Sequence, residues 1–258
     1  MKILMLLFFI FNAAFLMAQK TDSLPPHVYV WSGLKVIKED TGMRRQVMEG
    51  STTSLASFEV HASTLAPGQA PQPPHVYADM DELMIVKEGR VKITVNGVGK
   101  ILGRGSVAFA MAGDEHGIEN AGDSAAIYYV FKYKGKLPIN LERGKQNGGS
   151  FIINWNDVVV EKTDKGHRRA LFNKTTSQLE KLEMHTTALN AGLDSHPQHT
   201  HKEEEIILLL KGNVQMHIGN EFYNVAPGDV VFLPSLVLHN LLNTGKEQCE
   251  YFAFQWRN

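Results

Sequence analysis

The sequence predicts an all-β chain that contains two copies of one barrel-forming module. Two observations support this: strand-like segments and an internal repeat. Residues 91–95 and 214–218 alternate apolar and polar side chains, and the first of these segments runs into a hairpin-type turn, Asn96-Gly97. We find no long segment with the periodicity of an amphipathic helix. Many short strands with regular turns are typical of a double-sheet jelly roll or a closed barrel.

The repeat appears when the sequence is compared with itself at an offset of 124 residues, the separation of Trp31 and Trp155. After a one-residue deletion the offset becomes 123, and His116 then coincides with His239. Other coinciding residues are Gly42/Gly166, Arg44-Arg45/Arg168-Arg169, Glu59/Glu183, His61/His185, Gly68/Gly192, His75/His199, Glu82/Glu205, Gly89/Gly212, Gly105/Gly228 and Asn120/Asn243. We therefore predict two domains, 28–143 and 144–258, with a turn-rich linker at 144–150.

Composition and charge restrict the classes of partner. The chain has 26 Lys and Arg against 27 Asp and Glu, a formal net charge of −1, and no basic run. This pattern offers no electrostatic footprint for nucleic acid or a lipid surface. Cys249 is the only cysteine, so no disulfide forms within the chain and stability must come from burial.

The first 18 residues predict a secretory signal peptide. Lys2 precedes an apolar run that is broken only by Asn12 and that ends at the small residue Ala18. This run is shorter than the ~20 apolar residues that a membrane-spanning helix needs. No later segment is long and apolar enough to span a bilayer. We therefore expect an exported protein, periplasmic or extracellular, whose mature chain has no membrane span.

The second copy contains the residues of a metal site. His199 and His201 are two residues apart, so their side chains point to the same side of a strand, and Glu205 keeps that parity if the strand is regular. His239 comes from a later strand. Three imidazoles and one carboxylate suit one divalent transition metal, either Fe, Mn, Ni, Cu or Zn. Four protein ligands leave one or two positions open for substrate or water, whereas a structural site is normally closed.

This pattern resembles the cupin family. The first motif of that family, a glycine, two histidines, a glutamate and a glycine, is present as Gly192, His199, His201, Glu205 and Gly212. The second motif is present as Gly228, Pro234, His239 and Asn243, with Leu236 in place of a glycine. The resemblance covers essentially the whole mature chain. It implies tandem double-stranded β-helix (jelly-roll) barrels, that is a bicupin, and a homodimer formed by strand exchange or edge pairing.

The first copy departs from the family at one ligand position. His75, Glu82 and His116 fit the motifs, but Tyr77 stands where the second histidine is expected. Two histidines and one carboxylate form a candidate second metal site of the kind that holds non-haem iron. A neutral Tyr hydroxyl is a poor ligand. The alternative is a first barrel that has lost its metal and packs against the second.

The residues expected around the second-barrel metal are mostly apolar, as in many small-molecule sites. Glu203 has the parity of the ligands and is a candidate substrate contact, whereas Glu204 has the opposite parity and is expected in solvent. His196 is expected to be an ordinary loop residue. The apolar candidates for the pocket wall are Ile207, Leu209, Met216, Ile218, Leu241, Phe252, Phe254 and Trp256, some of which could instead be barrel core.

The resemblance implies three classes of function for a small-molecule substrate. The preferred class is an oxidoreductase, similar to quercetinase-like dioxygenases, which use three histidines and one glutamate. The second is a non-redox hydrolase, lyase or decarboxylase, similar to ureidoglycine aminohydrolases, whose ligand set differs. Oxalate decarboxylases tend to keep ligands in both barrels, and Tyr77 departs from that pattern. The third class is a non-catalytic binder of a small molecule or sugar. In an enzyme, Glu205 is the candidate catalytic base.

Overall fold

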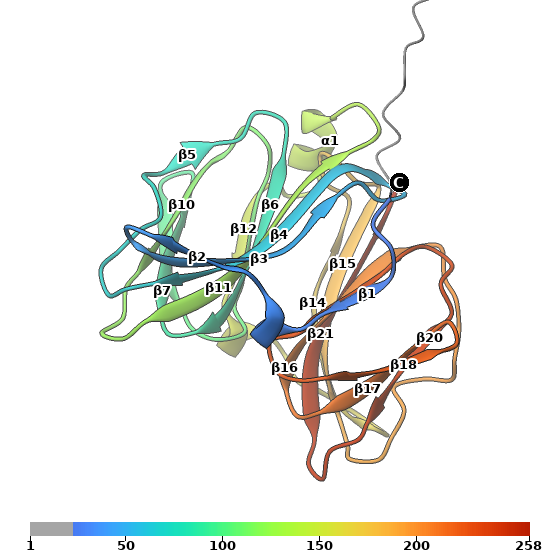
Figure 1. Cartoon of the computed structure of the whole chain (residues 1–258). Helices are drawn as coiled ribbons and strands as arrows, with labels where there is room; N and C mark the ends of the chain where they lie inside the picture. Colours follow the sequence, from blue (N-terminus) through green and yellow to red (C-terminus); the bar gives the residue numbers. More distant parts are fainter. Residues whose placement is uncertain (1–22) are drawn as a thin grey trace, which may run out of the picture.

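The computed structural model describes residues 23–258 (Figure 1). The predicted signal peptide, residues 1–18, lies outside the described residues. Between residues 23 and 258 most of the regular secondary structure is β-strand, with one short α-helix, α1 (Leu141–Gln146), and two 3-10 helices, η1 (Trp31–Gly33) and η2 (Trp155–Asp157). No helix in this range is long and apolar enough to cross a membrane. The prediction of an all-β chain with two jelly-roll barrels is confirmed.

The first barrel is built from a seven-stranded and a four-stranded antiparallel sheet. The larger sheet has the order β12 (Phe151–Ile153), β9 (Val107–Ala110), β6 (Asp81–Glu88), β11 (Ala126–Gly135), β4 (Leu55–Leu65), β3 (Gly42–Gly50) and β2 (Val36–Glu39). The smaller sheet has the order β5 (His75–Val76), β10 (Glu115–Asn120), β7 (Val91–Val95) and β8 (Val98–Leu102).

The second barrel repeats this plan. Its seven-stranded sheet has the order β1 (His27–Tyr29), β19 (Val230–Leu233), β16 (Glu204–Lys211), β21 (Cys249–Arg257), β15 (Lys181–Leu189), β14 (Gly166–Lys174) and β13 (Glu161–Thr163). Its smaller sheet has the order β18 (Glu221–Val225), β17 (Val214–Ile218) and β20 (His239–Asn243). β16 and β20 of the second barrel occupy the same places in their sheets as β6 and β10 of the first. Glu205 and His239 therefore take positions equivalent to those of Glu82 and His116.

Two strands cross between the barrels. β1, at the start of the first copy, pairs with β19 of the second barrel, and β12, at the start of the second copy, pairs with β9 of the first barrel (Figure 1). The predicted domain limits, 28–143 and 144–258, follow the repeat, but the hydrogen-bonded sheets do not. The segment predicted as a linker, 144–150, contains the end of α1 and leads directly into β12.

Each crossing strand is followed by a tryptophan that docks on the opposite barrel. The Trp31 backbone N–H donates to Asp229 Oδ1 at 2.8 Å, and the Trp155 N–H donates to Ser106 Oγ at 3.0 Å. The guanidinium carbons of Arg45 and Arg169 lie 4.6 and 4.2 Å from the centroids of these two rings. Such cation–π contacts stabilise the docked rings. One arginine of each repeated pair therefore holds the contact between the barrels.

The face of each large sheet that points away from its barrel interior is also buried. Ile206 and Leu208 of β16 pack in one cluster with Leu83 and Ile85 of the first barrel, so this cluster joins the two barrels. Ile207 and Leu209 alternate with them and face a separate cluster inside the second barrel. The apolar run 206–210 is thus buried on both faces, as its unbroken hydrophobicity predicts.

Candidate metal centre

The structure brings the four predicted second-barrel ligands together. His201 Nε2 lies 3.1 Å and His239 Nε2 lies 3.3 Å from Glu205 Oε2. The His199 ring centroid lies 4.6 Å from that of His239 and 5.3 Å from that of His201. Glu205 is on β16 and His239 on β20, while His199 and His201 precede β16 and His199 bridges to His239 through the backbone. A strand from each sheet therefore contributes to the centre.

The histidines are oriented by their own backbone neighbours. The Nδ1 of His201 bonds the Glu203 carbonyl oxygen at 2.9 Å, and the Nδ1 of His239 bonds the Val237 carbonyl oxygen at 2.9 Å. If Nδ1 carries the proton in each ring, Nε2 is a lone-pair donor directed at the centre, the arrangement found in protein metal sites. Among residues 23–258, the buried His239 Nε2 and His199 Nδ1 have no hydrogen-bond partner of good geometry. These unpartnered nitrogens fit a bound metal ion.

The charges of the cluster also suit a cation. Burial acts to raise the pKa of Glu205, but the imidazoles of His201 and His239 beside its carboxylate outweigh it and lower that pKa to about 2. The hydrogen bond to Glu205 raises the pKa of His201. Burial lowers the pKa of His199, so this ring is neutral at pH 7. Glu205 is therefore a carboxylate at neutral pH, the form that binds metal.

His196 belongs to the cluster, contrary to the expectation of an ordinary loop residue. Its ring centroid lies 3.9 Å from that of His199, and His196, His199 and His239 form a group whose nitrogens could bind one ion. His196 Nδ1 bonds the Pro197 carbonyl oxygen at 3.0 Å, the same arrangement as in His201 and His239. In the first copy Gln72 occupies the equivalent position, and its Nε2 lies 3.0 Å from His75 Nε2.

Replacing His196 by Gln is expected to weaken metal binding by about tenfold or more, because losses around metal sites typically cost 10–100-fold in affinity. The measurement is competition for Co²⁺ or Zn²⁺ against a chromophoric chelator. The matched control is His167→Gln, a change to an exposed histidine on β14. Equal metal affinity in both variants and in the wild type would show that His196 does not contribute to metal binding.

A cavity of about 250 Å³ adjoins the second-barrel cluster. Of the predicted apolar wall, Ile207, Met216 and Leu241 line it, whereas Leu209 and Ile218 lie in the core of the same barrel. Phe252, Phe254 and Trp256 lie in the cluster between the barrels, because Ala253 and Gln255 take the inward positions of β21. The remaining wall is more polar than predicted and includes His185, Thr187, Ser195, Asn240, Tyr251 and Gln255.

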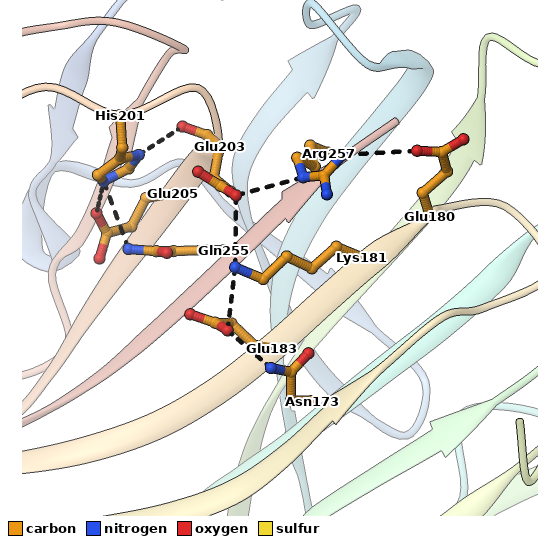
Figure 2. Close-up of polar contacts among 9 residues, drawn as sticks. All are labelled: Asn173, Glu180, Lys181, Glu183, His201, Glu203, Glu205, Gln255 and Arg257. Atoms are coloured by element: carbon orange, nitrogen blue, oxygen red, sulfur yellow. Dashed lines mark hydrogen bonds and ion pairs between the residues drawn. The ribbon is translucent and has the colours of Figure 1, made fainter.

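Glu203 is not among the residues that line this cavity. Its backbone carbonyl accepts from His201, but its carboxylate is held by Lys181 and Arg257, each at 3.4 Å (Figure 2). Figure 2 shows Glu203 and its partners Lys181 and Arg257 to the right of His201, whereas Glu205 and Gln255 both lie below the His201 ring. The Nε2 of Gln255 lies 3.4 Å from His201 Nε2. Gln255 therefore lines the cavity beside the cluster, whereas Glu203, the predicted substrate contact, does not.

The first barrel holds a second cluster at the equivalent place. His75, Glu82 and His116 form a group that could hold an ion, with His116 Nε2 3.5 Å from Glu82 Oε1. Tyr77 is present in the cluster, its ring centroid 4.8 Å from that of His75. These residues line a cavity of about 470 Å³, larger than that of the second barrel. The possible second metal site is thus assembled, although Tyr77 contributes no imidazole.

Comparison with known families matches the Cupin domain twice, at residues 62–132 and 185–254. These matches cover more than half of the chain, one in each barrel. The chain therefore belongs to the cupin family, with two cupin domains in tandem, and the resemblance drawn from the sequence motifs is confirmed. No curated protein sequence matches the chain.

Solved structures share the tandem arrangement at low sequence identity. AerE from Microcystis aeruginosa is 17% identical, with a TM-score of 0.67 over 90% of this chain and 99% of that protein. Protein Ylba from E. coli is 16% identical, with a TM-score of 0.67 over 93% of this chain and 95% of that one. The oxalate decarboxylase of Lactobacillus farciminis is 13% identical, with a TM-score of 0.69 over 92% and 87%. At these identities the likeness establishes the fold.

Proposed function

We propose that the second barrel is a metal-dependent active site for a small polar organic molecule and that its reaction is a non-redox hydrolysis, elimination or decarboxylation. The observation that carries this proposal is the cavity beside Glu205. Its volume, about 250 Å³, is below the roughly 300–1,000 Å³ of pockets for drug-sized ligands, and its wall is rich in hydroxyl, amide and imidazole groups.

Each residue has a defined task in this proposal. A divalent ion held by His199, His201, Glu205 and His239 would act as a Lewis acid toward a substrate oxygen. Glu205, ionised at neutral pH because its pKa is about 2, balances the charge of the ion. Gln255 and Tyr251 line the cavity and are placed to hydrogen-bond a polar substrate. A base role for Glu205 requires that its carboxylate leave the ion transiently.

Dioxygenase chemistry is the second candidate, because a set of three histidines and one glutamate also suits iron. The two candidates differ in their need for oxygen. A hydrolase, lyase or decarboxylase turns over small carboxylic acids or amides in the absence of dioxygen, whereas a dioxygenase consumes dioxygen in step with product. The third candidate, a non-catalytic binding protein, retains its ligand without turnover.

The first test is metal content per chain, measured by mass spectrometry on wild type and on His239→Ala, both purified without a metal-binding tag. We expect about one equivalent of a transition metal in the wild type and its loss in the variant, because His239 belongs to both ligand groups of the second barrel. A wild type that binds no metal even after reconstitution would refute the proposed active site and favour the binding protein.

We also propose export and self-association, both carried over from the sequence. The signal-peptide pattern of residues 1–18 supports a periplasmic or extracellular location. The family resemblance supports a homodimer. Sedimentation of the mature chain tests the dimer, and N-terminal sequencing of the secreted product tests the cleavage.

A further inference from the structure

The two barrels differ at two facing positions beside the candidate metal centres. The repeat places Tyr77 where the second barrel has His201. The strand register adds a second difference: Glu82 pairs across β6 and β11 with Lys132, whereas Glu205 pairs across β16 and β21 with Gln255. The second-barrel histidine and its neighbouring amide are therefore replaced in the first barrel by a phenol and an ammonium group.

The ammonium of Lys132 belongs to the first-barrel cluster. Its nitrogen lies 5.1 Å from the Tyr77 ring centroid, and Lys132 lines the same cavity as His75, Glu82 and His116. Burial acts to lower the pKa of Lys132, but a hydrogen bond with Tyr77 and the negative charges of Glu82 and Glu59 outweigh it and raise that pKa. Burial is the main cause of the lowered pKa of His75, with smaller contributions that include the charge of Lys132. Lys132 is thus a fixed cation in electrostatic contact with the candidate ligands.

A divalent ion and an ammonium group compete for the same carboxylate. In the second barrel the amide of Gln255 is neutral, so Glu205 is free to balance a metal ion. In the first barrel Lys132 is the cross-strand neighbour of Glu82 and lines the same cavity. An added ion would be repelled by this ammonium in a partly buried site, where solvent screens charges less than at the surface. Tyr77 supplies no imidazole to offset this repulsion.

We propose that the first barrel excludes divalent metals and that the ammonium of Lys132 takes the place of the ion beside Glu82. The barrel is then a metal-free organic pocket, and the chain binds one metal although it contains two clusters of ligand type. The His75, Glu82 and His116 geometry alone would admit an ion, and Lys132 together with Tyr77 decides against it. This inference concerns the first barrel and does not depend on the reaction proposed for the second.

The test uses a full-length chain whose second site has been removed by His199→Ala and His239→Ala. Equilibrium dialysis against Co²⁺, with the visible spectrum of bound Co²⁺, then reports on the first barrel alone. We expect no bound equivalent at Co²⁺ concentrations that saturate the wild type. Adding Tyr77→His and Lys132→Gln, which reproduces the second barrel's residues, is expected to create one bound equivalent.

Single substitutions distinguish the effect of the Lys132 charge on Co²⁺ affinity from the effect of the number of imidazole ligands. Lys132→Gln alone is expected to raise Co²⁺ affinity at least tenfold over the parent chain, and Tyr77→His with Lys132 retained is expected to bind more weakly than the double conversion. The matched control is Lys134→Gln, an exposed lysine two residues along the same strand, which pairs with Asp79 and should leave affinity unchanged. Thermal unfolding confirms that each variant is folded.

One equivalent of Co²⁺ bound by the parent chain at wild-type concentrations would overturn the proposal. So would a folded Lys132→Gln variant whose affinity equals that of Lys134→Gln. Because the second site is absent from all these chains, neither result bears on whether the second barrel of the wild type holds metal.

Discussion

Replacing Glu204 by alanine is expected to lower the free energy of unfolding by about 3 kcal/mol. Glu204 is fully buried, and its carboxylate accepts from the backbone N–H groups of Thr53 and Ser54, at 2.8 and 2.9 Å, and from the Thr52 hydroxyl at 2.9 Å. It also accepts from Trp256 Nε1 at 3.1 Å. Its removal leaves four donors without an acceptor, three of them on a loop of the first barrel.

Calorimetry or urea unfolding measures this loss, which corresponds to a fall in Tm of roughly 6–12 °C for a chain of this size. The control is Glu203→Ala, one residue earlier, whose half-buried carboxylate lies between the partly exposed Lys181 and the exposed Arg257. Exposed ion pairs contribute about 0–1 kcal/mol, so this control should unfold nearly as the wild type does. If both variants lost a similar free energy of unfolding, the hydrogen bonds of Glu204 to the first barrel would not stabilise the contact between the barrels.

Removing the metal ion is the second change for which we expect a large effect. An ion that binds the folded chain alone stabilises it by RT ln(1 + [L]/Kd), about 4.1 kcal/mol when free metal is 1,000 times Kd. Thermal unfolding with and without a chelator should therefore differ by roughly 8–16 °C. The four candidate ligand residues come from both sheets of the second barrel and the loop before β16, so an ion bound there would link segments that are distant in sequence.

Glu205→Gln provides the control for this experiment. The substitution keeps the shape of the side chain and removes the carboxylate that His201 and His239 face. We expect the Tm of this variant to be independent of the chelator. A wild type loaded with metal whose Tm ignores the chelator would show that the second-barrel cluster does not bind the ion.

Much of the fold could be predicted from the sequence, because the internal repeat relates residues at fixed offsets and the strands follow local patterns. The four predicted ligand residues also lie close together, but strand parity does not account for all of them. His199 and His201 lie before β16, which begins at Glu204, so the path of the preceding loop places them beside Glu205. The proximity of these residues therefore follows from the motif spacing, whereas metal binding by them remains a prediction.

The predictions from sequence are wrong where contacts between the two barrels determine whether a side chain is buried. Strand parity correctly directed Glu204 away from the metal, but that side of β16 is covered by the first barrel, so Glu204 is buried instead of solvated. The same covering accounts for Phe252 and Phe254, which pack between the barrels. Nothing in the local sequence indicates what lies against the outer face of a sheet. The position of His196 likewise depends on how the loop before the ligands folds back.

The crossing of β1 and β12 makes the two halves mutually dependent. Each half completes the edge of the sheet in the other half, in a reciprocal way that follows the internal repeat. In a two-fold symmetric pair of identical subunits, such reciprocity is the mark of an isologous interface in which each partner donates the same element to the other. This chain therefore reproduces, within a single polypeptide, the architecture of a domain-swapped dimer of one-barrel proteins. A half expressed alone would present the uncovered edge of β9 or β19, a template for pairing with another chain.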